Sequence, residues 1–125
     1  MSSLTASTRV GDAFVESFAD ADFERIESLL APDVAFRKLT PGGYAEATTV
    51  EGALEWFRNW RADVEDAELL AARVEPIGGK IQIEYTVRGV EDGMLQVFRQ
   101  TAYATIEDGR IAAMDVLCSG SHPVP

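Results

Sequence analysis

Lys38 has the side chain and the surroundings that are most favourable for chemistry in this sequence. It lies in a short alternating segment and shares one face with Val34 and Phe36, which are both apolar. A lysine desolvated by apolar walls has a lowered pKa and can act as a base or as an amine nucleophile. Two structural interpretations compete with catalysis. The ammonium can extend past Phe36 to the rim of the core, or it can pair with Glu46 across a hairpin.

Tyr85 is a second residue whose side chain could take part in chemistry. It lies on the apolar face of another alternating segment, together with Ile81, Ile83 and Val87. A tyrosine hydroxyl on such a face needs a hydrogen-bond partner. It could donate a hydrogen bond to a ligand oxygen, or it could belong to a core tyrosine that bonds to the backbone.

The residue counts argue against several other kinds of site. The chain has a single cysteine, Cys118, and a single histidine, His122, which lies close to its end. We therefore expect no internal disulfide, no zinc site of His and Cys ligands, no internal nucleophile–histidine pair and no cofactor. The acidic clusters lack the glycine and closing glutamate of a calcium loop, so we expect no bound metal.

The charge of the chain narrows its possible partners. It carries 21 acidic residues against 11 Lys and Arg, which gives a formal net charge of −10. Nucleic acids and anionic lipid surfaces attract clustered basic residues, so we expect neither as a partner. The sequence has no apolar run of membrane-spanning length and no signal-like N-terminus, and we expect a cytoplasmic protein.

The hydrophobic pattern predicts helices first and most strands afterwards. With 125 residues, of which 46% are apolar, we expect one packed domain with loose ends at about 1–7 and 119–125. The expected helices cover 8–19, a segment capped by Asp22 that stops at Ala31-Pro32-Asp33, and 51–64. The expected strands are 34–39, 44–50, 67–75, 81–87, 95–107 and 111–118, the last four forming an antiparallel meander. This order predicts an α+β fold.

Four short segments allow a more specific interpretation. They are Ala21-Asp22-Phe23, Leu30-Ala31-Pro32-Asp33-Val34, Val50-Glu51-Gly52-Ala53 and Glu107-Asp108-Gly109-Arg110-Ile111. In this order and spacing, over about residues 8–118, they resemble the SnoaL-like or ketosteroid-isomerase-like family of the nuclear-transport-factor-2-like fold. The resemblance implies a cone in which three helices pack inside a curved, mainly antiparallel sheet, with a ligand pocket at the open end. It also implies that the outer face of the sheet is a surface for dimerisation.

The same resemblance argues against the isomerase mechanism of this family. That mechanism uses a carboxylate base, a tyrosine and a protonated aspartic acid. Alignment of the shared segments places Phe14 at the tyrosine, Lys38 at the base and Ala102 near the protonated acid. None of the three has the required chemistry, so the ketosteroid isomerase catalytic set is lacking.

Asp115 becomes a candidate through the cyclase and epoxide-hydrolase branches, which place an acid on the last strand. Counting from Arg110-Ile111 puts that acid at Val116, whose neighbours on the same face are Met114 and Cys118. Asp115 then points to the opposite face, where it would be a solvated or interface charge. A one-residue β-bulge would instead turn Asp115 into the pocket.

The segment over 95–107 has two faces of different character. One face has Phe98, Gln100, Ala102, Ala104 and Ile106, and its small alanines would leave space for a cavity. The other face carries Arg99 and Tyr103, residue types that are enriched at interfaces. We therefore expect a homodimer that forms through this outer face.

Together these patterns predict a SnoaL-like protein that binds a small apolar or aromatic molecule. The expected pocket residues are Phe14, Phe18, Phe36, Trp60, Met114, Val116 and Cys118. If the protein is an enzyme, we expect acid–base chemistry of isomerase, cyclase or hydrolase type by Lys38, Tyr85 or an inward-turned Asp115. The alternative is a non-catalytic binding or dimerisation module, which a pocket without ionisable side chains would favour.

Overall fold

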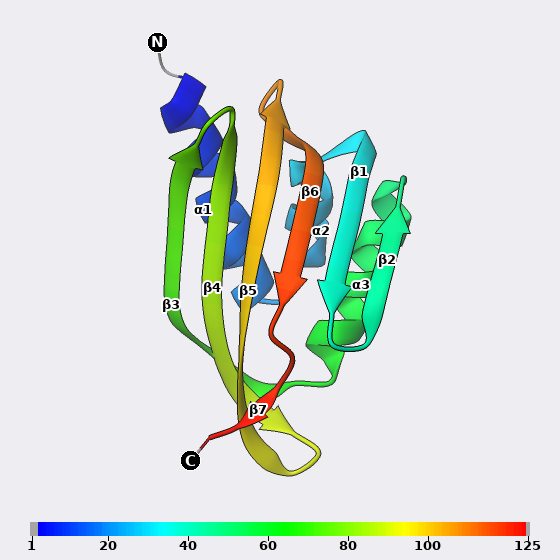
Figure 1. The fold of residues 1–125 in the computed structure, drawn as a ribbon, viewed down its shortest axis with the longest axis vertical. Coiled ribbons are helices and arrows are strands. Elements are labelled where there is room, and N and C mark those ends of the chain that lie inside the picture. The colour runs from blue at the N-terminus through cyan, green and yellow to red at the C-terminus, as the bar shows by residue number, and fades with distance from the viewer. Residues whose placement is uncertain (1–2, 125) are drawn as a thin grey trace.

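Three helices lie against one face of a large twisted sheet in a computed structural model of the protein (Figure 1). The structure describes residues 3–124, with the side chains of residues 6–59 and 61–124. The helices are α1 (Ser3–Ala19), α2 (Phe23–Leu29) and α3 (Val50–Ala62). The strands are β1 (Leu30–Thr40), β2 (Gly43–Ala47), β3 (Glu65–Ile77), β4 (Lys80–Glu91), β5 (Met94–Glu107), β6 (Arg110–Cys118) and β7 (His122–Pro123). Among the described residues, no helix is both long and apolar enough to cross a membrane.

The sheet has the strand order β2-β1-β6-β5-β4-β3. The short strand β7 is not part of this order and pairs with β5. Strands β3 to β6 form an antiparallel meander, as predicted. Strand β1 lies parallel to β6 and antiparallel to β2, so the two halves of the chain join at the β1–β6 pair. The predicted α+β cone, with helices inside a curved and mainly antiparallel sheet, is confirmed.

Two Asp-Gly turns set the register of the meander. Asp92 and Gly93 have φ angles of 53° and 77°, and Asp108 and Gly109 have 52° and 76°. Two consecutive residues with positive φ are typical of the type I′ turn, whose twist matches that of the flanking strands. The Asp108 hairpin was predicted. The connection between the strands expected at 81–87 and 95–107 is shorter than predicted, because β4 continues to Glu91, which pairs with Met94.

The first strand starts earlier than the sequence pattern predicts. Helix α2 ends at Leu29, and β1 begins at Leu30 and passes through Pro32, where the end of the helix was expected. The register between β1 and β6 shifts between Leu30 and Ala35. Proline lacks the N–H group that a regular ladder needs, so its place within this irregularity removes no regular bond.

Both expected loose ends contain regular structure. Helix α1 starts at Ser3, and β7 pairs with Gln96 and Val97 of β5. The N–H of Val124 also donates to the carbonyl of Leu95 at 3.1 Å. The small, polar and proline-rich composition of the tail gave no sign of this pairing, because the partner strand lies about 25 residues earlier in the chain.

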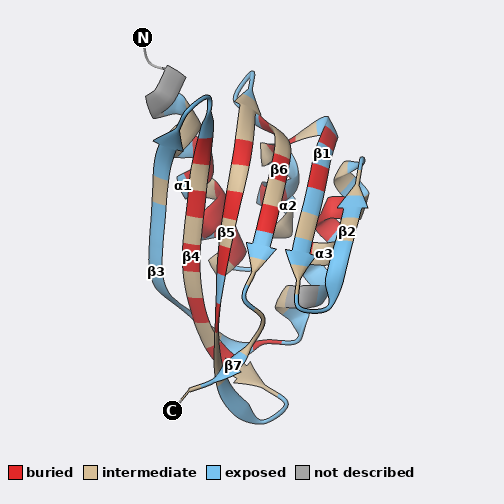
Figure 2. Cartoon of the chain, in the orientation of Figure 1, coloured by how far each residue is buried: buried red, intermediate tan, exposed pale blue. Residues whose placement is uncertain are grey.

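The core lies between the helices and the inner face of the sheet. Buried and partly exposed residues alternate along β4 and β5, as expected for strands with one covered face (Figure 2). Rings of Phe14, Phe57 and Phe36 fill the centre, with centroids 5.3 Å apart for the first two and 5.4 Å for the last two. Helix α1 approaches the sheet closely at Gly11, where a Cβ atom would lie 2.7 Å from Val74 Cγ1.

Candidate functional site

A cavity of about 340 Å³ lies at the end of the cone where β1 turns into β2 and β6 ends, at the lower end of Figure 1. Four stretches that are distant in sequence surround it: the β1–β2 turn, the middle of α3, the end of β4, and the end of β6 with the residues that follow it. Its lining residues are Thr40, Pro41, Gly42, Trp56, Glu91, Cys118, Gly120 and Ser121. This cavity is the candidate site because it is the opening next to the polar end of the core.

The inner face of the sheet changes from apolar to polar toward this cavity. Successive rows of paired residues cross β6, β5 and β4: Met114, Ala104 and Ile81, then Val116, Ala102 and Ile83, then Cys118, Gln100 and Tyr85. The first two rows consist of apolar residues alone. The third row, which we call the polar row, holds a thiol, an amide and a phenol and borders the cavity at Cys118.

Tyr85 and Gln100 form a buried hydrogen-bonded pair in the polar row. The Tyr85 hydroxyl donates to Oε1 of Gln100, and both residues are 1% exposed or less. Burial raises the pKa of the Tyr85 hydroxyl well above its usual value, and the neighbouring Cys118 adds a smaller contribution in the same direction. The hydroxyl is therefore protonated at neutral pH. Nε2 of Gln100 has no hydrogen-bond partner in the described structure.

Cys118 and the residues after it close one side of the cavity. The N–H of Gly120 donates to the thiol sulfur of Cys118 at 3.4 Å. Gly120 has a φ of 78°, and a Cβ atom at this position would lie 2.8 Å from Cγ of Pro41. Glycine therefore permits both the backbone conformation and the close approach of the tail to the β1–β2 turn.

Lys38 on β1 does not line the cavity, but its ammonium lies close to Trp56, which does. Its Nζ lies 5.3 Å from the ring centroid of Trp56, a distance at which the ring attracts a cation. This position agrees with an ammonium that extends past Phe36 to the rim. The proposed pairing with Glu46 is wrong, because Glu46 lies opposite Arg37 in the β1–β2 ladder and accepts a hydrogen bond from the Tyr44 hydroxyl at 2.6 Å.

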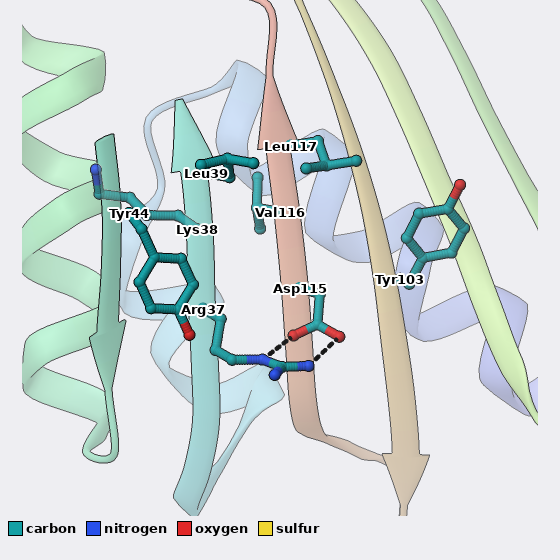
Figure 3. Close-up of a pocket in the computed structure, with 8 residues that line it drawn as sticks. All are labelled: Arg37, Lys38, Leu39, Tyr44, Tyr103, Asp115, Val116 and Leu117. Carbon is teal, nitrogen blue, oxygen red and sulfur yellow. Dashed lines mark hydrogen bonds and ion pairs between the residues drawn. The ribbon is translucent and has the colours of Figure 1, made fainter. Parts of the chain in front are cut away.

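Asp115 lies on the outer face of the sheet, away from the cavity. Its carboxylate accepts two hydrogen bonds from Arg37, at 2.6 Å from Nε and 2.9 Å from Nη2 (Figure 3). These bonds and the positive charge of Arg37 lower the pKa of Asp115 below its usual value. The β5–β6 register runs without a shift from Gln100–Cys118 to Thr105–Ala113. The bulge that would turn Asp115 inward is therefore not formed, and this residue cannot act inside the cone.

The expected pocket residues occupy two different environments. Phe14, Phe18, Phe36, Met114 and Val116 are at most 3% exposed and pack in the core beside the cavity. Cys118 lines the cavity itself. The side chain of Trp60 lies outside the described part of the structure. The structure thus brings Cys118, Tyr85 and Lys38 to one end of the cone.

Several residues of this site were not singled out from the sequence. Gln100 gave a usable signal, because it is a polar residue on the inner face between Phe98 and Ala102. Glu91 gave none, since its place at the cavity depends on how the β4–β5 hairpin packs. Within residues 3–124, no three His, Cys, Asp or Glu side chains are grouped so that they could hold a metal ion.

A helix-filled cone of this topology defines the nuclear-transport-factor-2-like class of proteins. The sequence also matches the family model of the SnoaL-like domain over residues 12–114. The chain therefore belongs to the SnoaL-like domain family. No curated protein matches the sequence.

Solved structures of the same class resemble the whole chain. A putative polyketide cyclase from Xanthomonas campestris pv. campestris is 21% identical, covers 91% of this chain and 90% of its own, and has a TM-score of 0.75. A LEH-like epoxide hydrolase from M. tuberculosis is 17% identical with a TM-score of 0.72, over 94% of this chain and 85% of its own. An NTF2-like protein from Anabaena variabilis is 14% identical with a TM-score of 0.78, over 94% and 89%. At these identities the likeness shows the fold.

Proposed function

We propose that the cavity at the open end of the cone binds a small, largely apolar molecule. The observation that carries this proposal is the cavity of about 340 Å³ that adjoins the buried polar row. Small-molecule sites in proteins combine apolar walls with a few convergent polar groups. Here the ring of Trp56 and the side chain of Pro41 provide apolar wall, and Tyr85 and Gln100 lie behind Cys118.

Acid–base catalysis in this cavity would depend on Lys38 or Tyr85. The ammonium of Lys38 lies over the ring of Trp56, which lines the cavity, and Tyr85 lies two positions from Cys118 in the polar row, beyond Gln100. The names of the similar structures, an epoxide hydrolase and a putative polyketide cyclase, favour hydrolase or cyclase chemistry. The test is Lys38→Met, which should abolish turnover of any substrate found. Unchanged binding and unchanged turnover would remove Lys38 from the site.

A non-catalytic binding module is the second candidate function. The observation in its favour is that the buried polar residues among those described are Ser17 and Gln100, so no carboxylate is buried there. Such an interior can hold a ligand, but it offers few groups that transfer protons at neutral pH. Turnover of a bound compound would contradict this alternative, whereas binding alone would agree with it.

Binding to the cavity can be tested with toluene and two matched variants. NMR titration of the wild-type protein with toluene should shift the amide signals of the β1–β2 turn and of Gly120 in a saturable way. Cys118→Phe fills the cavity and should weaken binding at least tenfold. Leu117→Phe introduces the same side chain one residue earlier, on the outer face, and should change the affinity for toluene less than twofold. Equal effects of the two variants, or no saturable shift, would contradict the proposal.

We also propose that a second copy of this chain covers the outer face of the sheet. A groove of about 290 Å³ crosses β2, β1, β6 and β5 there (Figure 3). Leu39, Tyr44 and Leu117 are 50%, 57% and 48% exposed beside it, and apolar area on adjacent strands favours association. Sedimentation at micromolar concentration should give twice the 13.6 kDa of the chain, and Leu117→Arg should give the single-chain mass. A wild-type protein of 13.6 kDa would overturn the proposed dimer.

A further inference from the structure

Gln100 brings an unused hydrogen-bond donor into an otherwise apolar interior. Its side chain is fully buried, and Nε2 has no partner among the described residues. A buried donor that has given up water without gaining a partner destabilises the fold. Nearly all buried polar groups in native proteins are satisfied, so an exception of this kind calls for an explanation. A ligand that accepts this hydrogen bond is one.

The bond from Tyr85 determines which part of the amide remains for a ligand. The Tyr85 hydroxyl donates to Oε1 of Gln100, so the acceptor end of the amide is already occupied. The hydroxyl keeps its proton at neutral pH, because burial raises its pKa. What remains is the N–H group, which can only donate. The complementary ligand must therefore supply an acceptor atom.

Gln100 lies directly behind a residue of the cavity wall. Gln100 pairs directly with Cys118 across β5 and β6, and Cys118 lines the cavity. The next two residues on the inner face of β5 are Ala102 and Ala104, whose side chains are small. A ligand atom that reaches the amide has to pass the thiol of Cys118, and the alanines beyond the amide place no large side chain there.

The surroundings of Gln100 favour an uncharged ligand. The residues that flank it in the ladder, Tyr85 and Cys118, carry no charge, and the next row is apolar. The ammonium of Lys38 is placed over the ring of Trp56. An anion buried at the polar row would lose its hydration without a counter-charge beside it, which is costly.

We propose that the ligand is an uncharged molecule with an apolar body and an acceptor oxygen, such as a ketone or ester carbonyl, and that Nε2 of Gln100 donates a hydrogen bond to this oxygen. This assignment rests on the proposed binding function of the cavity and names the ligand class that the cavity selects. Tyr85 acts as a positioning residue, because its hydroxyl fixes the orientation of the amide.

The test compares two molecules of nearly equal shape, acetophenone and α-methylstyrene, which differ in a carbonyl oxygen against a methylene group. Affinities are measured by NMR titration for the wild type, for Gln100→Leu and for Gln82→Leu, the same change on the outer face of β4. Gln100→Leu should weaken the binding of acetophenone about tenfold, the size expected for one lost hydrogen bond, and should not weaken the binding of α-methylstyrene. Gln82→Leu should leave both affinities unchanged.

A second readout does not depend on the stability of any variant. In the wild-type protein the side-chain amide signals of Gln100 should shift on addition of acetophenone and shift much less with α-methylstyrene. If both compounds bind, but Gln100→Leu changes the two affinities equally and the Gln100 amide signals do not respond, the assignment of Gln100 is overturned. The cavity then keeps its proposed function. If neither compound binds, both proposals are overturned.

Two further probes test the class of the ligand. Benzoate should bind at least tenfold more weakly than acetophenone, because it would bring a charge into the polar row. Tighter binding of benzoate would overturn the uncharged class. Tighter binding of pyrrole than of acetophenone that depends on Gln100 would overturn the role of Nε2 as donor, because the pyrrole N–H can only donate, here to the amide oxygen.

Discussion

The outer and inner faces of the same sheet each carry one polar pair, and the pairs differ in their surroundings. Arg37 and Asp115 form a two-bond ion pair on the outer face, with side chains 58% and 34% exposed. Tyr85 and Gln100 form an uncharged pair on the inner face and are almost fully buried. Water can replace each partner of the outer pair, so an exposed ion pair contributes little to stability. The inner pair is at most 1% exposed, so bulk water does not readily replace a partner that is lost.

This contrast shows where specificity can reside in an acidic protein. Most of the 32 charged residues behind the net charge of −10 lie on surfaces where water screens them. The interior holds few polar groups, and each has a larger influence because the surrounding dielectric is low. If the cavity binds a ligand as proposed, its selection would therefore depend mainly on this uncharged pair and little on the surface charges.

The largest expected effect is on the packing that keeps the inner pair dry. Phe57 is fully buried and its ring contacts those of Phe14, Phe36 and Trp56 at 5.0–5.4 Å. Phe57→Ala should lower the free energy of unfolding by about 3–5 kcal/mol, because it removes apolar contacts and leaves a cavity. Urea denaturation measures this change. A loss below about 1 kcal/mol would mean that the interior is not closely packed, and the contrast between the faces would fail.

An intermediate effect is expected for the inner pair itself. Tyr85→Phe leaves Oε1 of Gln100 without its donor and should cost about 1–3 kcal/mol. Gln100→Leu leaves the Tyr85 hydroxyl unpaired and should cost a similar amount. The double variant Tyr85→Phe, Gln100→Leu removes both polar groups and should be less destabilised than the sum of the single variants. Strictly additive losses in urea denaturation would show that the two side chains do not depend on each other.

The smallest effect is expected for the outer pair, and it should depend on pH. Because Arg37 lowers the pKa of Asp115 in the folded state, the pair stabilises the fold above the unfolded pKa of about 3.9. This contribution is lost as the pH falls through the folded pKa. Asp115→Asn should therefore lower the thermal midpoint slightly at pH 7 and should have less effect near pH 3. In an Arg37→Ala background the pH dependence should disappear, and its persistence would assign it to another group.

The sequence predicted the fold well, because its periodic segments are long and the Asp108-Gly109 turn is unambiguous. It predicted the beginning of β1 poorly, since Pro32 normally marks an end of regular structure and here lies in a register shift. The candidate site was predicted only in part. Alternation placed Tyr85 inward and Asp115 outward, but the hydrogen bond to Gln100 depends on the β4–β5 register.

Other parts of the site required knowledge of the tertiary structure. The wall of the cavity combines the β1–β2 turn, Trp56 and the tail after Cys118, which no local pattern connects. The five core residues expected around the pocket were placed inward correctly by their periodicity. Periodicity gives the direction of a side chain, but it does not give the depth at which packed core ends and open cavity begins.

The close approach of Gly120 to Pro41 has a consequence for engineering. A single methyl group at position 120 would lie 2.8 Å from the proline ring, so Gly120→Ala must push the tail and the β1–β2 turn apart. A glycine outside the polar row therefore sets how closely the tail and the β1–β2 turn approach each other at the cavity wall. Under the proposed binding function, substitutions at this position would change the size of molecule that fits without altering Tyr85 or Gln100.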